Sequence, residues 1–473
     1  MGSKAKDFHM LFFPFMAHGH MLPLIDMAKL FGAHGARITI LTTPVNASII
    51  RPTIDDSIQL HIISFPSVEF GLPEGCENRK FPLPVNLHIN FSKAVASLRH
   101  PFDSVLRDLR PDCVVTDMLL PWTYYVAAAR GIPRLIFHGL NNFSLCIMDA
   151  YERCRPLVGE AESFVLHGLP HRIELLETQA MDINKLVGTP MEFIQEIFKE
   201  MKEVEPKSHG MVMNSFYELE PEYVDHHREV MGRRVWNIGP VSLCNQDVKY
   251  KSARGGEQPT LASECLKWLD KKPRGSVVYI CFGSKGYFSM AQLKEMALGL
   301  EASNHSFIWV VQTGDNNWAP EGYDERIKGR GMVIRGWAPQ LLILNHIAVG
   351  GFVTHCGWNS SLEGICAGLP MVTWPLYAEQ FYNEKLLVEV LQIAVGVGSK
   401  VYDVNPETRP IVEAIVVEDA VKSLMGGGEE KDERRRKAKE LGEKARRAIE
   451  KGGSSHNEIE KLMQELINWR KHV

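Results

Sequence analysis

Residues 337–380 read WAPQLLILNHIAVGGFVTHCGWNSSLEGICAGLPMVTWPLYAEQ, and this stretch of 44 residues carries the densest signal in the sequence. Its apolar residues 351–354 predict a buried strand, residues 355–360 the turn that follows it, and residues 361–367 a helix. Small and polar residues between a strand and a helix form an anion site, because free backbone N–H groups and the helix dipole face the ligand. The stretch therefore predicts a strand-turn-helix unit that binds a negatively charged group.

Several side chains of this stretch suit the base and phosphates of a nucleotide. His355, Asn359 and Ser360 stand in the predicted turn, where their side chains can donate hydrogen bonds to a pyrophosphate. Trp337 can stack on an aromatic base, and Gln340 can hold that base through its amide.

Carboxylate and amide side chains of the same stretch suit sugar hydroxyls. Glu363 can accept hydrogen bonds from a ribose, and Glu379 and Gln380 can bond the hydroxyls of a second sugar. Each of these residues also has a structural interpretation. Ser360-x-x-Glu363 is a capping box that needs no ligand, and Trp337 can be a core aromatic residue.

Outside this stretch, strands alternate with helices. The pattern predicts strands at 9–15, 37–41, 113–116, 134–137, 276–282 and 307–311, and helices at 21–31, 122–129 and 290–301. This alternation predicts parallel sheets covered by helices in two α/β halves with a cleft between them. The predicted domains are an N-terminal domain (1–240), a linker (241–275), a C-terminal domain (276–455), and a last helix (456–473) that returns to the N-terminal domain.

Composition excludes several classes of protein. The chain has 473 residues, 45% of them hydrophobic and 23% charged, with a formal net charge of -4, which is typical of a globular protein of two or three domains. Neither a basic nucleic-acid footprint, a membrane span nor a signal peptide is recognisable. The nine cysteines contain no C-x-x-C pair. We expect a cytoplasmic monomer that binds no nucleic acid and inserts into no membrane.

The 337–380 stretch resembles the signature of plant UDP-dependent glycosyltransferases of glycosyltransferase family 1, the plant secondary product glycosyltransferase box. The resemblance extends over essentially the whole chain. It implies an α/β fold of the GT-B architecture, in which two Rossmann-like domains with parallel sheets face each other across a cleft. It also implies that the C-terminal domain holds most of the nucleotide sugar.

The resemblance implies a role for each residue of the box. Trp337 would stack on uracil, Ala338 and Gln340 would fix the base and ribose, and Glu363 would hold the ribose hydroxyls. The implied pyrophosphate contacts are His355, Asn359, Ser360 and, from the loop 281–288, Ser284. Trp358, Glu379 and Gln380 are similar to residues around the transferred sugar, and the terminal Gln resembles glucose-using members. The Ser284 loop also has a structural interpretation, since Ser289-x-x-Gln292 would cap the next helix.

The catalytic base is expected in the N-terminal half. Residues 13–24 read FPFMAHGHMLPL, in which His20 stands at the start of the predicted helix and His18 is the alternative. The positive end of the helix dipole favours neutral imidazole, the form that a base needs. The family pattern implies His20. Asp117 ends a predicted strand and resembles the aspartate that orients the imidazole, although a helix cap would also explain it.

The implied reaction is an inverting displacement on UDP-glucose, which gives a β-glucoside. UDP-glucose is a co-substrate, and no cofactor or metal is expected, since the chain has no D-x-D pair. We expect a small hydrophobic plant metabolite as the acceptor, a flavonoid or other phenolic compound, with a triterpenoid or saponin as the alternative. The candidate acceptor-pocket residues are Phe15, Met16, Trp122, Phe143 and Tyr377.

Other α/β enzymes fit the sequence less well. A nicotinamide-dependent dehydrogenase or epimerase would have G-x-G-x-x-G after the first strand, a serine esterase G-x-S-x-G, and a P-loop enzyme G-K-[ST]. None of these motifs occurs in the corresponding position. A protein that binds a UDP-sugar without catalysis stays open as an alternative, and the presence of both His20 and Asp117 argues against it.

Overall fold

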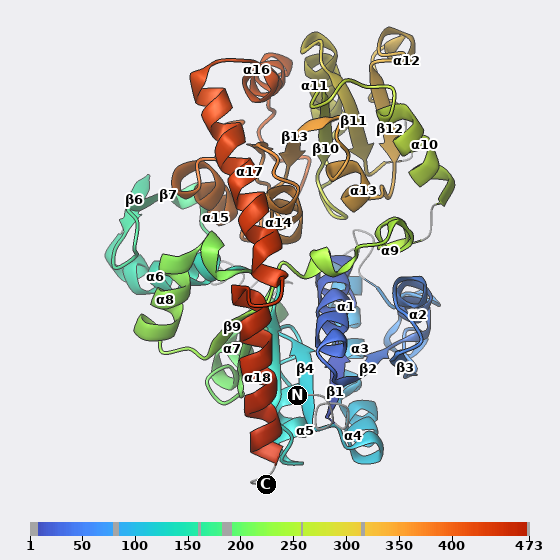
Figure 1. Cartoon of the computed structure of the whole chain (residues 1–473), viewed down its shortest axis with the longest axis vertical. Helices are drawn as coiled ribbons and strands as arrows, with labels where there is room; N and C mark the ends of the chain where they lie inside the picture. Colours follow the sequence, from blue (N-terminus) through green and yellow to red (C-terminus); the bar gives the residue numbers. More distant parts are fainter. Residues whose placement is uncertain are drawn as a thin grey trace. The chain divides into compact units, whose positions relative to one another are not determined.

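A computed structural model of the chain describes residues 8–78, 85–158, 162–181, 192–256, 259–313 and 317–470. The chain forms two compact units, each built around a parallel sheet (Figure 1). The first unit comprises Met1–Asn142, Asp182–Glu257 and Arg447–Val473. The second comprises Phe143–Met181 and Gln258–Arg446.

The sheet of the first unit has seven strands in the order β3-β2-β1-β4-β5-β8-β9, and its neighbouring strands are parallel. Its strands are β1 (His9–Phe13), β2 (Arg37–Thr42), β3 (Ile58–Ile62), β4 (Cys113–Asp117), β5 (Arg134–His138), β8 (Gly210–Met213) and β9 (Val235–Asn237). The strand order reverses direction between β1 and β4. Ligands of open α/β sheets bind at such a point, beside the carboxyl ends of the strands.

Helices cover both faces of this sheet. Successive residues of each strand point to opposite faces, so each strand contributes side chains to two cores. In β1, Met10 and Phe12 enter one core, and Leu11 and Phe13 enter the other. The first core includes residues of α1 and α18, and the second includes residues of α3 and α4. The helices are α1 (His18–Ala33), α2 (Pro44–Ile50), α3 (Val85–Ser97), α4 (Arg99–Leu109), α5 (Thr123–Ala128), α7 (Glu192–Val204), α8 (Pro221–Asp225), α9 (Val248–Ala253) and α18 (Ser454–Arg470).

The sheet of the second unit has six parallel strands in the order β12-β11-β10-β13-β14-β15. They are β10 (Val277–Cys281), β11 (Ser306–Val311), β12 (Gly331–Arg335), β13 (Val349–Thr354), β14 (Met371–Thr373) and β15 (Ala394–Gly396). An antiparallel pair, β6 (Ser163–Leu166) and β7 (Ile173–Leu176), also belongs to this unit. Here too the strand order reverses, between β10 and β13.

The core of the second unit packs α11 and α16 against the sheet. Val278 and Ile280 of β10 share this core with Met296 of α11 and Val417 of α16. The helices are α6 (Asn142–Val158), α10 (Pro259–Leu269), α11 (Met290–Ala302), α12 (Tyr323–Arg326), α13 (Gln340–Leu344), α14 (Trp358–Cys366), α15 (Gln380–Lys385), α16 (Ala414–Met425) and α17 (Glu429–Ile449).

The two units divide the chain differently from the predicted domains 1–240, 276–455 and 456–473. Residues 143–181 lie in the second unit, where Ser144 donates to Asn383 Oδ1 (2.9 Å) and Thr178 to the carbonyl of Lys400 (2.6 Å). The predicted linker 241–275 is also divided, since 241–257 belong to the first unit and α10 to the second. Residues of α18, among them Leu462 and Leu466, lie in a core of the first unit.

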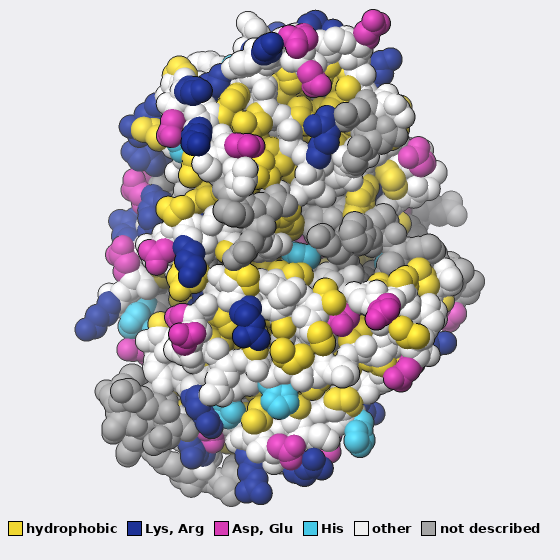
Figure 2. All heavy atoms as spheres, turned by 90° about the vertical axis from the view of Figure 1, so that its right-hand side faces the viewer, with side chains coloured by type: hydrophobic (Ala, Val, Ile, Leu, Met, Phe, Trp, Pro, Cys, Tyr) yellow, Lys and Arg dark blue, Asp and Glu magenta, His cyan; other side chains and the backbone are white. Residues whose placement is uncertain are grey.

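Charged side chains of both signs are interspersed with hydrophobic ones on the face that Figure 2 shows. None of the helices in the described ranges is long and apolar enough to cross a membrane. All nine cysteines have free thiols, and seven of them are buried.

Candidate active site

His20 lies in the first turn of α1, which follows β1 after the loop 14–17. The helix begins at His18, three residues before the predicted start at residue 21, and the backbone N–H of His20 donates to the carbonyl of Ala17 (3.0 Å). Its imidazole Nδ1 lies 2.9 Å from Oδ2 of Asp117. The His20 side chain is 24% exposed, whereas that of Asp117 is fully buried. His18, the alternative base, is buried.

Asp117 is the last residue of β4, and both of its carboxylate oxygens accept hydrogen bonds. Oδ2 faces the His20 imidazole, and Oδ1 accepts from the backbone N–H of Leu119 (2.9 Å). A carboxylate can only accept, so the neutral form of the His20 imidazole carries its proton on Nδ1 and its lone pair on Nε2. The helix-cap interpretation of Asp117 is wrong, because α5 begins at Thr123 after Trp122.

Apolar and backbone groups enclose the His20 ring. Phe15 meets it edge-on, with ring centroids 5.7 Å apart. A Cβ atom at Gly139 would lie 3.6 Å from the imidazole, so the backbone after β5 approaches the ring closely. Burial lowers the pKa of the neighbouring His138 to about 4, which keeps that imidazole neutral at ordinary pH. His20 is thus the partly exposed imidazole beside a buried carboxylate.

In the second unit, α14 begins at Trp358, three residues earlier than predicted. Gly357 precedes it as the N-cap residue, and no side chain caps the helix. Asn359 and Ser360 therefore belong to the first turn, whose backbone N–H groups have no partner within the helix. The capping-box interpretation of Ser360 and Glu363 is wrong, since both residues lie inside the helix.

Gln340, Ser360 and Glu363 form one hydrogen-bonded cluster. Nε2 of Gln340, the first residue of α13, donates to Glu363 Oε2 (2.7 Å) and to Ser360 Oγ (3.2 Å). Ser360 and Glu363 are buried, and Gln340 is half-buried. Trp337 lies half-buried three residues before Gln340, and Ala338 between them is buried, with its carbonyl accepting from the N–H of Gln340 (2.8 Å).

His355 directly follows β13, and the backbones of two glycines, Gly283 and Gly357, approach its imidazole ring. A Cβ atom at Gly283 would meet its imidazole at 2.8 Å, and one at Gly357 would meet it at 2.4 Å, so neither position admits a side chain. Burial lowers the pKa of His355 to about 4. Within the described ranges, Nδ1 of His355 and the hydroxyl of Ser361 are buried without a hydrogen-bonding partner. Buried polar groups in this state call for a partner, such as a ligand or water.

The loop after β10 carries Ser284, which is half-buried. The loop ends at Ser289, which caps α11 by accepting from the N–H of Gln292 (3.3 Å), as the sequence predicted. Gln312, which follows β11, donates from Nε2 to the carbonyls of Gly283 and Gly336, each at 3.2 Å. One amide group therefore joins the backbone before Ser284 to the backbone before Trp337.

Side chains within and just after residues 337–380 hold the end of this stretch. Oε1 of Gln380 accepts from the N–H groups of Leu376 (2.9 Å) and Tyr377 (3.1 Å). Nδ2 of Asn383 donates to the carbonyl of Cys356 (2.8 Å) and lies 3.4 Å from Oε1 of Glu379. The Gln380 oxygen is thus engaged by the backbone. The indole of Trp358 is 2% exposed.

The candidate acceptor-pocket residues lie mostly in packed surroundings. Phe15, Met16, Trp122 and Phe143 are all buried. The hydroxyl of Tyr377 donates to the carbonyl of Lys285 (2.9 Å) on the Ser284 loop. Of these residues, Phe15 contacts the His20 ring edge-on.

Sequence reasoning missed three residues that organise these clusters: Gln312, Asn383 and Arg134, whose guanidinium donates to the carbonyl of Asp117 (3.3 Å). Gln312 stands at the carboxyl end of a strand, which is a signal for a site residue in an open α/β sheet. Asn383 lies one helical turn after Glu379, so its spacing was visible in the sequence. Arg134 opens a strand with a charge, and nothing in the local pattern says where its guanidinium points.

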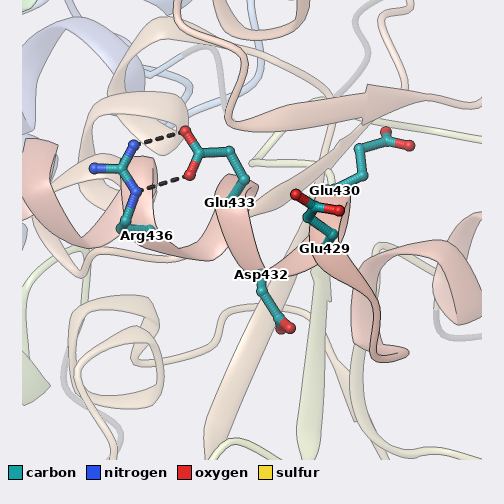
Figure 3. Close-up of a pocket in the computed structure, with 5 residues that line it drawn as sticks. All are labelled: Glu429, Glu430, Asp432, Glu433 and Arg436. Atoms are coloured by element: carbon teal, nitrogen blue, oxygen red, sulfur yellow. Dashed lines mark hydrogen bonds and ion pairs between the residues drawn. The ribbon is translucent and has the colours of Figure 1, made fainter.

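Acidic side chains also line a surface hollow at the start of α17 (Figure 3). Glu429, Glu430 and Asp432 lie in its first turn, where negative charge is stabilised by the helix dipole. Glu433 pairs with Arg436 through both oxygens, at 2.6 and 2.7 Å. The described residues include no group of three or more His, Cys, Asp or Glu side chains that could hold a metal ion.

Comparison with known families places the chain. Residues 184–399 match the family described as UDP-glucoronosyl and UDP-glucosyl transferase, and residues 7–243 match the glycosyltransferase N-terminal domain. The chain is 47% identical to a scopoletin glucosyltransferase of Nicotiana tabacum, over 98% of both chains. It is 46% identical to UDP-glucose flavonoid 3-O-glucosyltransferase 7 of Fragaria ananassa, over 98% of this chain and 96% of the relative.

Solved structures agree. The Glycyrrhiza uralensis enzyme UGT73P12, complexed with glycyrrhetinic acid 3-O-monoglucuronide, superposes with a TM-score of 0.92 at 39% identity, over 98% of this chain and 96% of that chain. Phytolacca americana UGT2, complexed with UDP-2fluoro-glucose and pterostilbene, has a TM-score of 0.79 at 28% identity, over 97% and 99%. The chain belongs to the UDP-glycosyltransferase family. It is a glycosyltransferase of the GT-B fold class with a UDP-sugar as co-substrate.

Proposed function

We propose that this enzyme is an inverting, UDP-glucose-dependent O-glucosyltransferase that forms β-glucosides of small hydrophobic plant metabolites. The observation that carries the proposal is the 2.9 Å contact of a partly exposed imidazole, His20, with a buried carboxylate, Asp117. Relatives named as scopoletin, flavonoid and anthocyanin glucosyltransferases support a flavonoid or other phenolic acceptor.

In the proposed mechanism His20 acts as a general base. Its Nε2 takes the proton of the acceptor hydroxyl while the oxygen attacks the anomeric carbon of UDP-glucose. The bond from that carbon to the β-phosphate oxygen breaks, and UDP leaves with the electron pair. A single displacement inverts the α-linked donor to a β-glucoside. Asp117 holds the Nδ1 proton and stabilises the imidazolium that forms, the role of the aspartate in catalytic triads.

The donor would be held by the second unit. Gln340 and Glu363 form one hydrogen-bonded cluster that suits the base and ribose beside Trp337 and Ala338. The first turn of α14 offers N–H groups to the pyrophosphate, which His355, Asn359, Ser360 and Ser284 would supplement. Trp358, Glu379 and Gln380 would surround the glucose. The orphaned Nδ1 of His355 and hydroxyl of Ser361 support a polar ligand here.

The proposal extends to the acceptor pocket, the oligomeric state and the location of the enzyme. Phe15, which contacts the His20 ring, is the acceptor-pocket candidate with the strongest geometric support, and Met16, Trp122, Phe143 and Tyr377 are retained as weaker candidates. We further propose that the enzyme acts as a monomer in the cytoplasm. Size-exclusion chromatography with light scattering tests the monomer, and a fluorescent fusion of the full chain tests the location.

The test of the function is product detection by mass spectrometry. Purified enzyme is incubated with UDP-glucose and a panel of flavonols, coumarins, simple phenols and triterpenoid aglycones. We expect a mass gain of one hexose on phenolic members, and a large anomeric proton coupling in the NMR spectrum of the product, which marks a β-glucoside. An α-glucoside would refute the inverting mechanism.

A triterpenoid acceptor is the second candidate, because the Glycyrrhiza uralensis structure contains a triterpenoid glucuronide. Transfer confined to the triterpenoid members of the panel would establish it in place of the phenolic acceptor. Binding of UDP-glucose without transfer to any member would favour a protein that binds the sugar nucleotide without catalysis.

A further inference from the structure

Arg134 is a buried arginine whose hydrogen bonds all go to uncharged oxygens. It is the first residue of β5, and 2% of it is exposed. Its guanidinium donates to the hydroxyls of Thr116 (2.7 Å) and Ser208 (3.2 Å), and to the carbonyls of Asp117 (3.3 Å) and Leu120 (3.4 Å). Arginine is rarely buried to this degree without a carboxylate partner, so its position calls for an explanation.

The bonds of Arg134 converge on the segment that carries Asp117. Three of its four acceptors belong to residues 116–120, which form the end of β4 and the turn that follows. That turn also supplies the N–H of Leu119, which donates to Oδ1 of Asp117. The planar guanidinium therefore holds the Thr116 hydroxyl before the carboxylate and the backbone carbonyls of Asp117 and Leu120 in the turn, a task for which the rigid fork of arginine is suited.

The charge of Arg134 acts on the Asp117 carboxylate. Burial lowers the pKa of Arg134 to about 9, and the negative charge of Asp117 opposes that shift, so the cation and the carboxylate interact. Glu200 of α7 also faces Arg134, and burial raises the pKa of Glu200. His138 faces both Asp117 and His20, and is neutral at ordinary pH because its pKa is about 4.

We propose that Arg134 is a positioning residue for the His20–Asp117 pair: its fork fixes the turn that aims the carboxylate, and its charge offsets that of the carboxylate that His20 faces. The inference rests on the proposed function of His20 as the base. A buried cation beside a carboxylate reduces the negative potential that would otherwise favour imidazolium.

The first test changes the charge around Arg134 and leaves its side chain intact. Ser208 Oγ accepts from one guanidinium nitrogen at 3.2 Å, so Ser208→Asp places a carboxylate beside the cation, and Ser208→Asn is the matched neutral control. Histidine labelled at Cε1 is followed by NMR in a pH titration, and His20→Ala identifies the His20 resonance. We expect the His20 midpoint to move up by about half a pH unit in Ser208→Asp and to stay in place in Ser208→Asn.

The second test separates the fork from the charge. Arg134→Lys keeps the cation and loses the fork, so kcat should fall about tenfold with the His20 midpoint and the KM for UDP-glucose unchanged. Arg134→Met loses both the fork and the charge, so the His20 midpoint should rise as it does in Ser208→Asp. An unmoved midpoint in Ser208→Asp would overturn the electrostatic part, and full kcat in Arg134→Lys would overturn the positioning part.

The two tests also separate this inference from the proposed function. The NMR midpoint is measured without acceptor or donor, so it reports on Arg134 even if the enzyme transfers no glucose to the panel. A wild-type enzyme without transferase activity, but with a midpoint that moves in Ser208→Asp, would refute the proposed function and keep the electrostatic coupling. An active wild-type enzyme whose midpoint does not move in Ser208→Asp would keep the proposed function and refute the electrostatic coupling.

Discussion

Replacing Asp117 by asparagine tests the geometry of the candidate base most sharply. The carboxylate accepts from two donors, Nδ1–H of His20 at 2.9 Å and the N–H of Leu119 at 2.9 Å. Asparagine has one oxygen for these two donors. If its oxygen faces Leu119, the amide NH₂ faces His20 and moves the imidazole proton to Nε2, which then cannot act as a base.

The magnitude follows from the distance. At an effective dielectric constant of about 20, opposite unit charges about 3 Å apart attract by about 5–6 kcal/mol, which the imidazolium loses in the variant. If the amide oxygen of the introduced asparagine faces His20 instead, its dipole recovers part of this energy. Since about 1.4 kcal/mol corresponds to a factor of ten in rate, we expect kcat of Asp117→Asn to fall about 10²- to 10⁴-fold.

Initial rates of UDP release at saturating acceptor and UDP-glucose measure this effect, and calorimetry measures the affinity for UDP. The affinity should stay within about twofold, because the candidate donor residues lie in the other unit. Asp112→Asn is the matched control: its carboxylate binds the N–H of His9 (2.7 Å) at the opposite end of β4. A kcat of Asp117→Asn within about tenfold of the wild-type value would refute the reasoning.

Three further changes concern the second unit. Gln340→Leu removes the donor that binds Glu363 at 2.7 Å, and should raise the Kd for UDP about tenfold in calorimetry, whereas an unchanged Kd would remove this residue from the site. Gln380→His loses the acceptor of two backbone N–H groups, and should lower kcat/KM for UDP-glucose more than for UDP-galactose; an unchanged donor ratio would exclude Gln380 as a selector. Burial raises the pKa of Glu384 from 4.5 to about 7, so the folded chain holds this proton more tightly than the unfolded chain does. That stabilisation is complete below pH 4.5 and is lost as the pH rises through 7, by up to about 3 kcal/mol. Glu384→Gln should therefore raise the Tm at pH 8 and leave it unchanged at pH 4.5, and an equal shift at both would contradict the assignment.

The alternation of strands and helices was predictable because apolar runs and their spacing are local properties of the chain. Strand ends differ from the prediction by a residue or two, as for β4, which extends to Asp117. The start of α14 was predicted three residues too late, since 358–360 read as turn residues. The backbone at Gly357 determines where this helix begins, and no side chain marks it.

Long-range packing was not predictable from local patterns. Residues 143–181 belong to the second unit and are joined to the rest of it by contacts such as that of Ser144 with Asn383. These two residues lie far apart in the sequence. From the sequence alone, a buried core position for Phe143 could not be distinguished from a position in the wall of a pocket. Both predict an apolar residue at helical spacing. Arg134 donates hydrogen bonds around Asp117 to four residues that no motif connects with it.

The most direct test of the account is glucose transfer by His20→Ala compared with the wild-type enzyme, on the acceptor that the panel identifies. Product is quantified by mass spectrometry with UDP-glucose as donor, and calorimetry measures UDP binding by the same preparations. The account predicts that the variant loses transfer by at least about a thousandfold and binds UDP with unchanged affinity. Transfer at a rate near that of the wild type would contradict the claim that His20 is the base. Loss of UDP affinity would contradict its placement outside the donor site.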